Sequence, residues 1–276
     1  MRHKYVILLT ACVRPKGMAN TKHVDCGQRE KEYREAIHFY IQNTSLPIVF
    51  CENTLFDMSN EFSTYIVSGR LEYLTYDGNH YDKNRGKGVG EVEIMEYAFE
   101  HSRLLHNGDN IIKITGRLKV LNIKRLILSR QMFGTNFIQV KIKEDGSFVH
   151  SQFFIAPMAF LKKNFIPLGQ NIDDRNYVYF EHVLGKAVKE QNEYVVLPLF
   201  LFPLISGISG TNGQVYETNF PLYMRMHYIK WGLVENLHFN RKYALTKMSF
   251  INNIIVKCYL GIIMLYISMY HLFYKK

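Results

Sequence analysis

Runs of branched and aromatic apolar residues alternate with amphipathic segments along the first half of the chain. Apolar residues follow one another with few charges at four places, which indicates buried strands: residues 5–10, 46–51, 71–76 and 111–114. Between these runs, residues 29–42 carry apolar side chains at spacings of three and four, and the same spacing returns from Glu91 onward after a glycine-containing loop. Strands that alternate with helices predict an α/β fold, a Rossmann-like and mostly parallel sheet.

The second half of the chain is less regular. Residues 133–160 alternate loosely and predict a hairpin that turns at Asp145 and Gly146. Residues 174–189 are expected to form one helix, and residues 205–216 a glycine-rich loop. Because open parallel sheets bind ligands at the carboxyl ends of their strands, the residues that follow each predicted strand are the first candidates for a site.

The last part of the chain has a different composition. Residues 258–274 contain no Asp, Glu, Lys or Arg, and lysines lie on both sides, at Lys257 and at Lys275 and Lys276. A membrane-spanning helix needs about 20 apolar residues, with a lower limit near 17, and tyrosines suit a membrane interface. We therefore expect a domain at residues 1–235 and a basic, hydrophobic, membrane-associating tail at residues 236–276. The alternative is a C-terminal helix packed on the domain.

Charge and cysteine content narrow the classes of partner. The formal net charge is +10, which points to anionic partners such as phosphate-bearing molecules or an acidic membrane surface. No helix-turn-helix, zinc-finger or RNP-like pattern is present, so nucleic acid is not an expected partner. The four cysteines form no C-x-x-C pair and are expected to be reduced thiols in the cytoplasm. The short apolar run at residues 5–13 lacks a clear cleavage site, which favours a first strand over a signal peptide.

Basic and glycine residues gather after two of the predicted strands. After the first strand, Thr10 leads into a loop with Arg14, which is either a phosphate contact or a solvated basic loop. After the third strand, the segment from Asp77 to Glu91 places Arg85, Lys87 and Gly88 before a helix. Cations and exposed backbone N–H groups at a helix N-terminus bind anions, although a tight turn would require the same glycines.

The stretch IIKITGRLKV places two cations at the end of a buried strand. Lys113 and Arg117 flank Thr115 and Gly116 there. A fully buried cation costs several kcal/mol unless it is paired, so both side chains are expected to reach a cleft and meet an anionic ligand. The alternative for Arg117 is a salt bridge to a neighbouring carboxylate.

Two carboxylates in the second half are candidates for acid–base chemistry. Glu181 lies among aromatic residues and is either a general base or a helix-surface residue. Asp174 is the second candidate, with helix capping as its alternative role. Ser209 and Gly210, in the glycine-rich segment, are candidates for closing over a phosphate or an acceptor sugar, or for a simple flexible loop.

Several stretches together resemble bacterial glycosyltransferases of capsule, O-antigen and other surface-polysaccharide gene clusters, with the A-type glycosyltransferase fold. The resemblance covers roughly residues 4–216. It is carried by the order and spacing of YVILLTACVRPKG, LPIVFCENT, LEYLTYDGN, GKGVGEVEIMEYAFEHS, IIKITGRLKV, SQFFIAP, YFEHVLGKAV and ISGISG.

The resemblance implies an enzyme, a hexosyltransferase-like glycosyltransferase of capsule or lipopolysaccharide biosynthesis. It would move a sugar from a UDP-, GDP- or CMP-linked donor to a lipid-linked or growing glycan, at the cytoplasmic face of the bacterial inner membrane. Donor-binding residues would then be Thr10, Arg14, Asn53, Asp77, Arg85, Lys87, Gly88, Lys113, Thr115 and Arg117. Ser209 and Gly210 would face the acceptor, and Glu181 or Asp174 would act as the base. The alternative is a non-enzymatic membrane-associated binding or scaffold protein of the polysaccharide machinery.

The resemblance also raises the question of a metal. A-type enzymes usually carry Asp-x-Asp at a strand end, where the carboxylates hold a divalent cation against the diphosphate. Here the matching stretch is IKITGR, which contains no acid. The hypothesis is that Lys113 and Arg117 help to replace the metal. Mg²⁺ or Mn²⁺ bound elsewhere, for example at Asp77 or Asp173, is the alternative.

Overall fold

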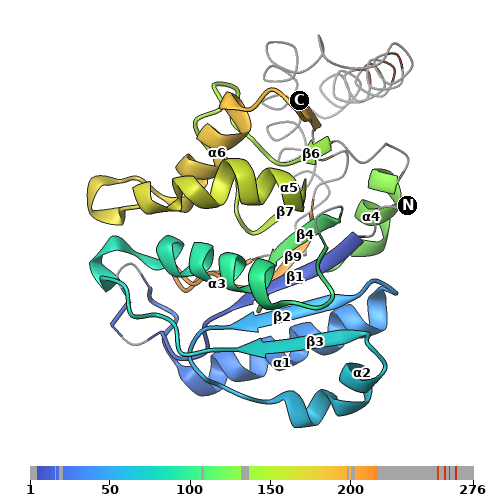
Figure 1. The fold of residues 1–276 in the computed structure, drawn as a ribbon, viewed down its shortest axis with the longest axis vertical. Coiled ribbons are helices and arrows are strands. Elements are labelled where there is room, and N and C mark those ends of the chain that lie inside the picture. The colour runs from blue at the N-terminus through green and yellow to red at the C-terminus, as the bar shows by residue number, and fades with distance from the viewer. Residues whose placement is uncertain are drawn as a thin grey trace, which may run out of the picture.

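A seven-stranded α/β sheet forms the centre of the molecule (Figure 1). The computed structural model describes residues 5–15, 17–18, 21–106, 109–131, 137–197, 199 and 203–216, together with Ile254, Cys258, Gly261 and Leu265. The strand order is β3-β2-β1-β4-β7-β6-β8. The strands are β1 (Tyr5–Ala11), β2 (Ile48–Glu52), β3 (Leu71–Thr75), β4 (Asn110–Thr115), β6 (Phe137–Gln139), β7 (Phe153–Pro157) and β8 (Val195–Leu197).

The first four strands are parallel, and they are the four that the hydrophobic pattern predicts. Strand β1 pairs with β2 on one side and with β4 on the other, and β2 pairs with β3. Strand β7 runs antiparallel to both β4 and β6, while β6 and β8 are parallel. The prediction of a mostly parallel sheet is therefore confirmed. The carboxyl ends of β1, β2 and β4 lie next to one another at one edge.

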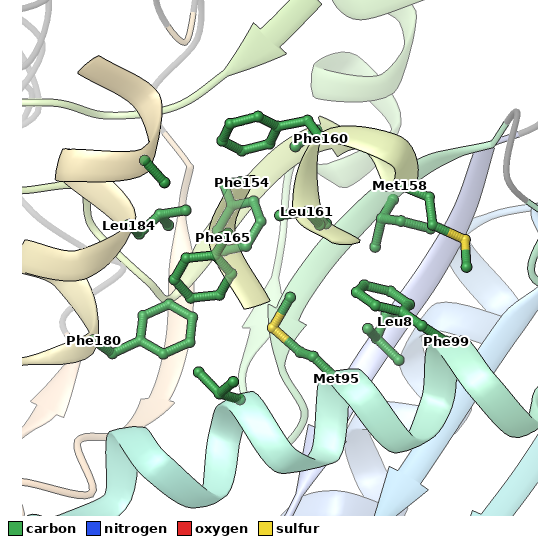
Figure 2. Packing of buried hydrophobic residues seen from close by; sticks show 14 of the residues in the cluster. Leu8, Met95, Phe99, Phe154, Met158, Phe160, Leu161, Phe165, Phe180 and Leu184 are labelled. Carbon is green, nitrogen blue, oxygen red and sulfur yellow. The ribbon is translucent and has the colours of Figure 1, made fainter. Parts of the chain in front are cut away.

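Helices cover both faces of the sheet because successive strand residues point to opposite sides. One core cluster contains Ile7, Leu9 and residues of α1 (Cys26–Asn43) and α4 (Ile123–Gln131). The other contains Leu8, residues of α3 (Lys87–His101) and residues of α6 (Phe180–Glu190). Figure 2 shows this second cluster, in which Met95 and Phe99 of α3 lie opposite Phe154, Phe165 and Phe180.

Short elements complete the fold. A second, three-stranded antiparallel sheet of order β10-β9-β5 is formed by β5 (Lys119–Val120), β9 (Ile205–Ile208) and β10 (Val215–Tyr216). The remaining helical elements are η1 (Ser59–Phe62), α2 (Ser63–Val67), η2 (Lys83–Arg85), α5 (Met158–Phe160), η3 (Leu161–Phe165), η4 (Ile166–Asn171) and η5 (Asp174–Asn176).

The predicted hairpin in residues 133–160 is present within the described residues. Strand β6 pairs antiparallel with β7, and a bridge joins Ile142 to Val149. Gly146 takes a positive φ of 74°, and its N–H donates to the Lys143 carbonyl. The turn predicted at Asp145-Gly146 is therefore confirmed.

Two predicted helix starts are wrong. Helix α3 begins at Lys87 rather than Glu91, so Gly88 and Gly90 lie in its first turns and not in a loop. A Cβ on Gly88 would lie 3.0 Å from Phe180 Cβ, which shows that this glycine lets α3 pack closely against α6. Helix α6 begins at Phe180 rather than Asp174, because Tyr177 adopts a left-handed conformation with φ 59° that ends the short η5 turn before it.

The glycine-rich segment at residues 205–216 is also more regular than predicted. It forms the hairpin β9–β10, with residues 209–214 as its tip. The hairpin is joined to the main domain because Lys119 and Val120 of β5 pair with Ser206 and Ile205. The prediction of a plain loop is therefore wrong for this segment.

A buried carboxylate joins two loops and a strand end at the edge of the sheet where β1, β2 and β3 end. Glu52, at the end of β2, is fully buried. It accepts hydrogen bonds from the N–H of Val13 at 3.0 Å, of Thr54 at 2.8 Å and of Phe56 at 2.9 Å, and from the Thr75 hydroxyl at 3.2 Å. Glu52 therefore holds the segments that follow β1 and β2 in fixed positions relative to the end of β3.

The predicted tail lies almost entirely outside the described residues. Four residues of the predicted tail are described, and each is helical and exposed: Ile254, Cys258, Gly261 and Leu265. Within the described part of the chain, no helix has the length and apolar character needed to cross a membrane. The division at residue 235 and the C-terminal hydrophobic helix therefore stay predictions.

Candidate functional site

A cavity of about 170 Å³ opens where β1, β2 and β4 end. Its walls come from the ends of these strands, the first turns of α3, the residues before β7, the start of α6 and the tip of the β9–β10 hairpin. Charged side chains of both signs line it: Arg29, Lys87, Glu91, Arg117, Asp174 and Glu181. Strand ends, a helix N-terminus and charged groups thus meet in one hollow.

Two cations lie at the wall of this cavity beneath the hairpin tip. The Lys87 ammonium, in the first turn of α3, donates to the Thr211 hydroxyl. The Arg117 guanidinium donates to the Ile208 carbonyl and lies 3.6 Å from a carboxylate oxygen of Glu32. Burial lowers the pKa of both side chains from their ordinary values. The salt bridge considered for Arg117 is therefore present, and its side chain lines the cavity as well.

Lys113 does not line the cavity, so the expectation that it reaches a cleft is wrong. Its side chain is 0% exposed. The ammonium donates to Glu91 Oε1, which lies nearer the cavity, and to the Ser151 carbonyl at 2.8 Å, and it lies over the rings of Phe154 and Phe180. Burial is tolerated here because the cation is paired and hydrogen-bonded. Lys113 therefore holds the Glu91 carboxylate in place from its buried side.

Glu91 is a residue of the site that sequence reasoning missed. The Thr10 hydroxyl donates to its Oε1 at 3.1 Å, and the Lys113 ammonium contacts the same oxygen. Its side chain is 18% exposed and lines the cavity. The signal was present in the sequence, because Lys87 and Glu91 are four residues apart and so share one face of α3. With the helix predicted to start at Glu91, Lys87 was not recognised as lying on the same helical face as Glu91.

Glu181 lies in the first turn of α6 and faces the cavity. The Ser151 hydroxyl donates to its Oε1 at 2.5 Å, and the Val149 N–H donates to its backbone carbonyl. No ion pair of Glu181 occurs among the described residues. The Glu181 carboxylate therefore faces the cavity, and its role as a general base stays a prediction.

Asp174 also lines the cavity, but it does not cap the helix for which it was considered. It lies in η5 and is 9% exposed. A Cβ on Gly86, the residue before α3, would fall on the Asp174 carboxylate, and Gly86 has φ 91°. The carboxylate thus lies against the N-terminal end of α3, which favours negative charge.

Asn53, directly after β2, presents an unpaired amide to the same region. The residue is 0% exposed, and neither its Oδ1 nor its Nδ2 has a hydrogen-bond partner among the described residues. It lines the main cavity and also a second hollow, which contains Arg14, Asp77 and Lys83. A buried amide without partners is costly, so this position favours a ligand with both a donor and an acceptor.

The structure thus brings together most of the residues that the sequence singled out. The main cavity is lined by Thr10, Asn53, Lys87, Gly88, Thr115, Arg117, Asp174, Glu181, Ser209 and Gly210. Arg14 and Asp77 line the adjoining hollow. Arg85 lines neither, because its guanidinium donates to the carbonyls of Gln170 and Ile172.

Arg29, Tyr33 and Cys12 form a further part of the wall that the sequence did not reveal. The Arg29 guanidinium donates to the Cys12 carbonyl at 3.1 Å and to the His23 carbonyl at 3.0 Å. The Cys12 N–H donates to the Tyr33 hydroxyl at 3.0 Å. Arg29 and Tyr33 come from α1, and a helical pattern alone cannot show that its polar face meets a strand end.

The Cys12 thiol is expected to react slowly with alkylating reagents. Burial raises its pKa to about 11, so the thiol is neutral at pH 8, and its reactive thiolate forms only as the pH approaches 11. An ordinary thiol has a pKa of about 8.5, so the fraction of Cys12 present as thiolate at pH 8 is about 200-fold lower than that of an ordinary thiol. Iodoacetamide labelling followed by peptide mass spectrometry should modify the exposed Cys26 first. Labelling in urea is the control, and equal folded-state rates at pH 8 would contradict the prediction.

The side chains at the cavity do not form a recognisable metal site. Within the described ranges, no three His, Cys, Asp or Glu side chains are grouped so that they could hold a metal ion. Two alternative metal positions were considered, Asp77 and Asp173. Asp77 Oδ1 lies 3.1 Å from His80 Nε2. Hydrogen bonds from Arg175 lower the pKa of Asp173 to about 2, so that carboxylate is engaged as well.

The chain has distant similarity to solved transferase structures. No protein-family model matches it, and no curated protein matches it. The mannosyltransferase Ktr4p of S. cerevisiae is 11% identical, with 90% of this chain and 83% of that chain covered and a TM-score of 0.45. A cytidylyltransferase of Leptospira borgpetersenii is 11% identical over 85% of this chain and 97% of that chain, with a TM-score of 0.39.

A third similar structure is described as a nucleotide-diphospho-sugar transferase of Desulfovibrio desulfuricans. It is 14% identical, with 71% of this chain and 80% of that chain covered and a TM-score of 0.38. Similarity of this degree assigns no activity to the present chain.

Proposed function

We propose that this chain is a glycosyltransferase that moves a sugar from a nucleotide-sugar donor to a glycan acceptor. The observation that carries the proposal is the cavity at the strand ends, where Lys87 and Arg117 lie in the same hollow as Glu181. Cations at this edge suit a diphosphate, and a carboxylate beside them suits removal of a proton from an acceptor hydroxyl. The unpaired amide of Asn53 suits the polar edge of a nucleobase.

The residues have distinct parts in the proposed reaction. Lys87 and Arg117 hold the diphosphate and stabilise the charge that grows on it as the bond to the sugar breaks. In an inverting transfer, the acceptor oxygen forms the new bond to the anomeric carbon, and its proton passes to the Glu181 carboxylate. The electron pair of the broken bond leaves with the nucleoside diphosphate. The Ser151 hydroxyl, 2.5 Å from Glu181 Oε1, keeps the carboxylate aimed at the cavity.

The finer assignment is to surface-polysaccharide synthesis at the inner membrane, with a lipid-linked acceptor. It is supported by the apolar stretch at residues 258–274 and the lysines at its two ends. Ile254 and Leu265, within or beside that stretch, are helical and exposed. Binding of the full chain to vesicles that contain anionic lipid, compared with neutral vesicles, tests this part separately.

A non-enzymatic scaffold protein is less well supported. Such a protein has no need for an accessible carboxylate, and its Glu181 would be expected in a salt bridge or a closed cleft. Instead Glu181 lines an open cavity and accepts a hydrogen bond from Ser151. The geometry therefore favours the enzyme.

The test is a thermal-shift panel with UDP, GDP, CMP and their sugar conjugates in the presence of Mg²⁺ and Mn²⁺. At least one nucleotide at 100 times its Kd is expected to stabilise the protein by about 2.7 kcal/mol, which raises Tm by several degrees. The stabilising donor should then release its nucleoside phosphate when an acceptor is added. If no nucleotide stabilises the protein and no donor is consumed, the proposal is wrong.

A further inference from the structure

The strand end that faces the diphosphate in the proposed reaction carries no acid. Strand β4 ends at Thr115 and is followed by Gly116 and Arg117. A divalent cation at this position needs carboxylate oxygens, which Thr115 and Arg117 do not supply. The residues at the end of β4 therefore do not fit the metal that the A-type resemblance implies.

Three carboxylates near this position accept hydrogen bonds, and a fourth, Asp174, lies against Gly86 at the start of α3. Glu91 Oε1 accepts from both Lys113 and Thr10, and Glu181 Oε1 accepts from Ser151. Glu32 lies 2.9 Å from His23 and 3.6 Å from Arg117. No set of three such side chains in the described part of the chain is arranged to hold a metal ion.

Two cations are placed where the charge of a metal would be needed. Lys87 and Arg117 line the same cavity. Burial lowers the pKa of Lys87, while the nearby carboxylates of Glu91 and Glu181 act in the opposite direction. Each donates to a neutral atom of one segment, Lys87 to the Thr211 hydroxyl and Arg117 to the Ile208 carbonyl, and Arg117 also lies 3.6 Å from Glu32. A phosphate oxygen is a stronger acceptor than either atom, so a diphosphate can replace them.

Resting on the function proposed above, we propose that Lys87 and Arg117 supply the positive charge that binds the donor diphosphate, so that this chain binds nucleoside diphosphates without a divalent metal. The diphosphate of a nucleotide sugar carries about two negative charges, and these two side chains are cations that it can contact in the cavity, where Arg29 adds a third. Arg117 provides a planar fork for two phosphate oxygens, whereas Lys87 provides a point charge at the start of α3. Lys113, which the sequence suggested for this part, is already paired with Glu91.

The experiment measures UDP, GDP and CDP binding to the full chain by calorimetry, in EDTA and in Mg²⁺ or Mn²⁺. The Kd in EDTA is expected to lie within about threefold of the Kd with metal. Lys87→Met and Arg117→Met should each weaken binding in EDTA about 10- to 100-fold, the loss expected for a charge-assisted hydrogen bond. Arg117→Lys keeps the charge without the fork and should have a smaller effect.

The matched control is Arg85→Met, two residues before Lys87. Arg85 binds backbone carbonyls away from the cavity, so nucleotide Kd should not change. Lys87→Met keeps the proposal testable if Arg117→Met fails to fold, because Arg117 is only 6% exposed.

The outcomes separate this inference from the proposed function. Binding that occurs only with Mg²⁺ or Mn²⁺ overturns the inference and leaves the glycosyltransferase proposal standing. Binding in EDTA that both variants leave unchanged also overturns it. If the wild-type chain binds no nucleotide under either condition, both proposals fail together.

Discussion

Glu181→Gln is expected to lower kcat for sugar transfer by about 100- to 10,000-fold, the usual contribution of a general base. Glutamine has nearly the same shape and keeps an oxygen that can accept the hydrogen bond from Ser151, now 2.5 Å from Glu181 Oε1. It cannot take the proton of the acceptor hydroxyl. Nucleotide Kd is therefore expected to stay within about twofold, since the diphosphate contacts belong to other residues. Steady-state transfer kinetics and calorimetry on the same preparation measure the two quantities.

The matched control is Glu190→Gln in the same helix. Glu190 lies in the last turn of α6, its side chain is 60% exposed, and it does not line the cavity. Its replacement should leave both kcat and Kd unchanged. A Glu181→Gln variant that retains wild-type kcat would remove Glu181 from the reaction. An equal loss of nucleotide binding would instead give it a part in holding the donor.

Lys113→Met is expected to lower the free energy of unfolding by about 3–5 kcal/mol, because it leaves the Glu91 carboxylate without its buried counter-charge. The Lys113 side chain is fully buried and contacts Glu91, the Ser151 carbonyl and two aromatic rings. Urea unfolding monitored by circular dichroism gives the difference in unfolding free energy. Since methionine fills most of the same volume, the loss reports on charge rather than on an empty space.

Lys119→Met provides the comparison for this prediction. The Lys119 ammonium pairs with the Glu35 carboxylate at 2.9 Å, and the two side chains are 27% and 45% exposed. Removing this exposed pair should lower the free energy of unfolding by about 0–1 kcal/mol. The double variant Lys113→Met with Glu91→Gln should be more stable than Lys113→Met alone, because neither partner is then charged. If Lys113→Met lowers the free energy of unfolding no more than Lys119→Met does, the buried pair does not stabilise the fold.

The sequence was sufficient for the parallel half of the sheet and less informative beyond it. Four apolar runs correspond to β1, β2, β3 and β4, because strands buried on both faces must be apolar throughout. The short strands β5, β9 and β10 were missed, since two to four residues carry no periodicity and are stabilised by pairing with distant segments. The start of α6 was missed because the left-handed Tyr177 leaves no mark in the residue pattern.

The candidate site was predictable where it depends on strand ends. Arg117 was singled out because it follows a buried strand, and it lines the cavity. The same reasoning gives a wrong prediction for Lys113. Its ammonium pairs with Glu91, which lies on a helix that no local pattern connects to β4. Pairing of buried charges depends on tertiary structure, so sequence reasoning can state the cost of burial but not which partner removes it.

The two sides of the cavity differ in how freely evolution can alter them. Glu52 receives hydrogen bonds from the segments after β1 and β2 and from the end of β3, so a residue inserted in either segment would disturb the other. The β9–β10 hairpin joins the domain through the two residues of β5 and the contacts of its tip, and its length can change without altering the central sheet. Related chains are thus expected to differ in length at the hairpin more than in the segments that Glu52 joins.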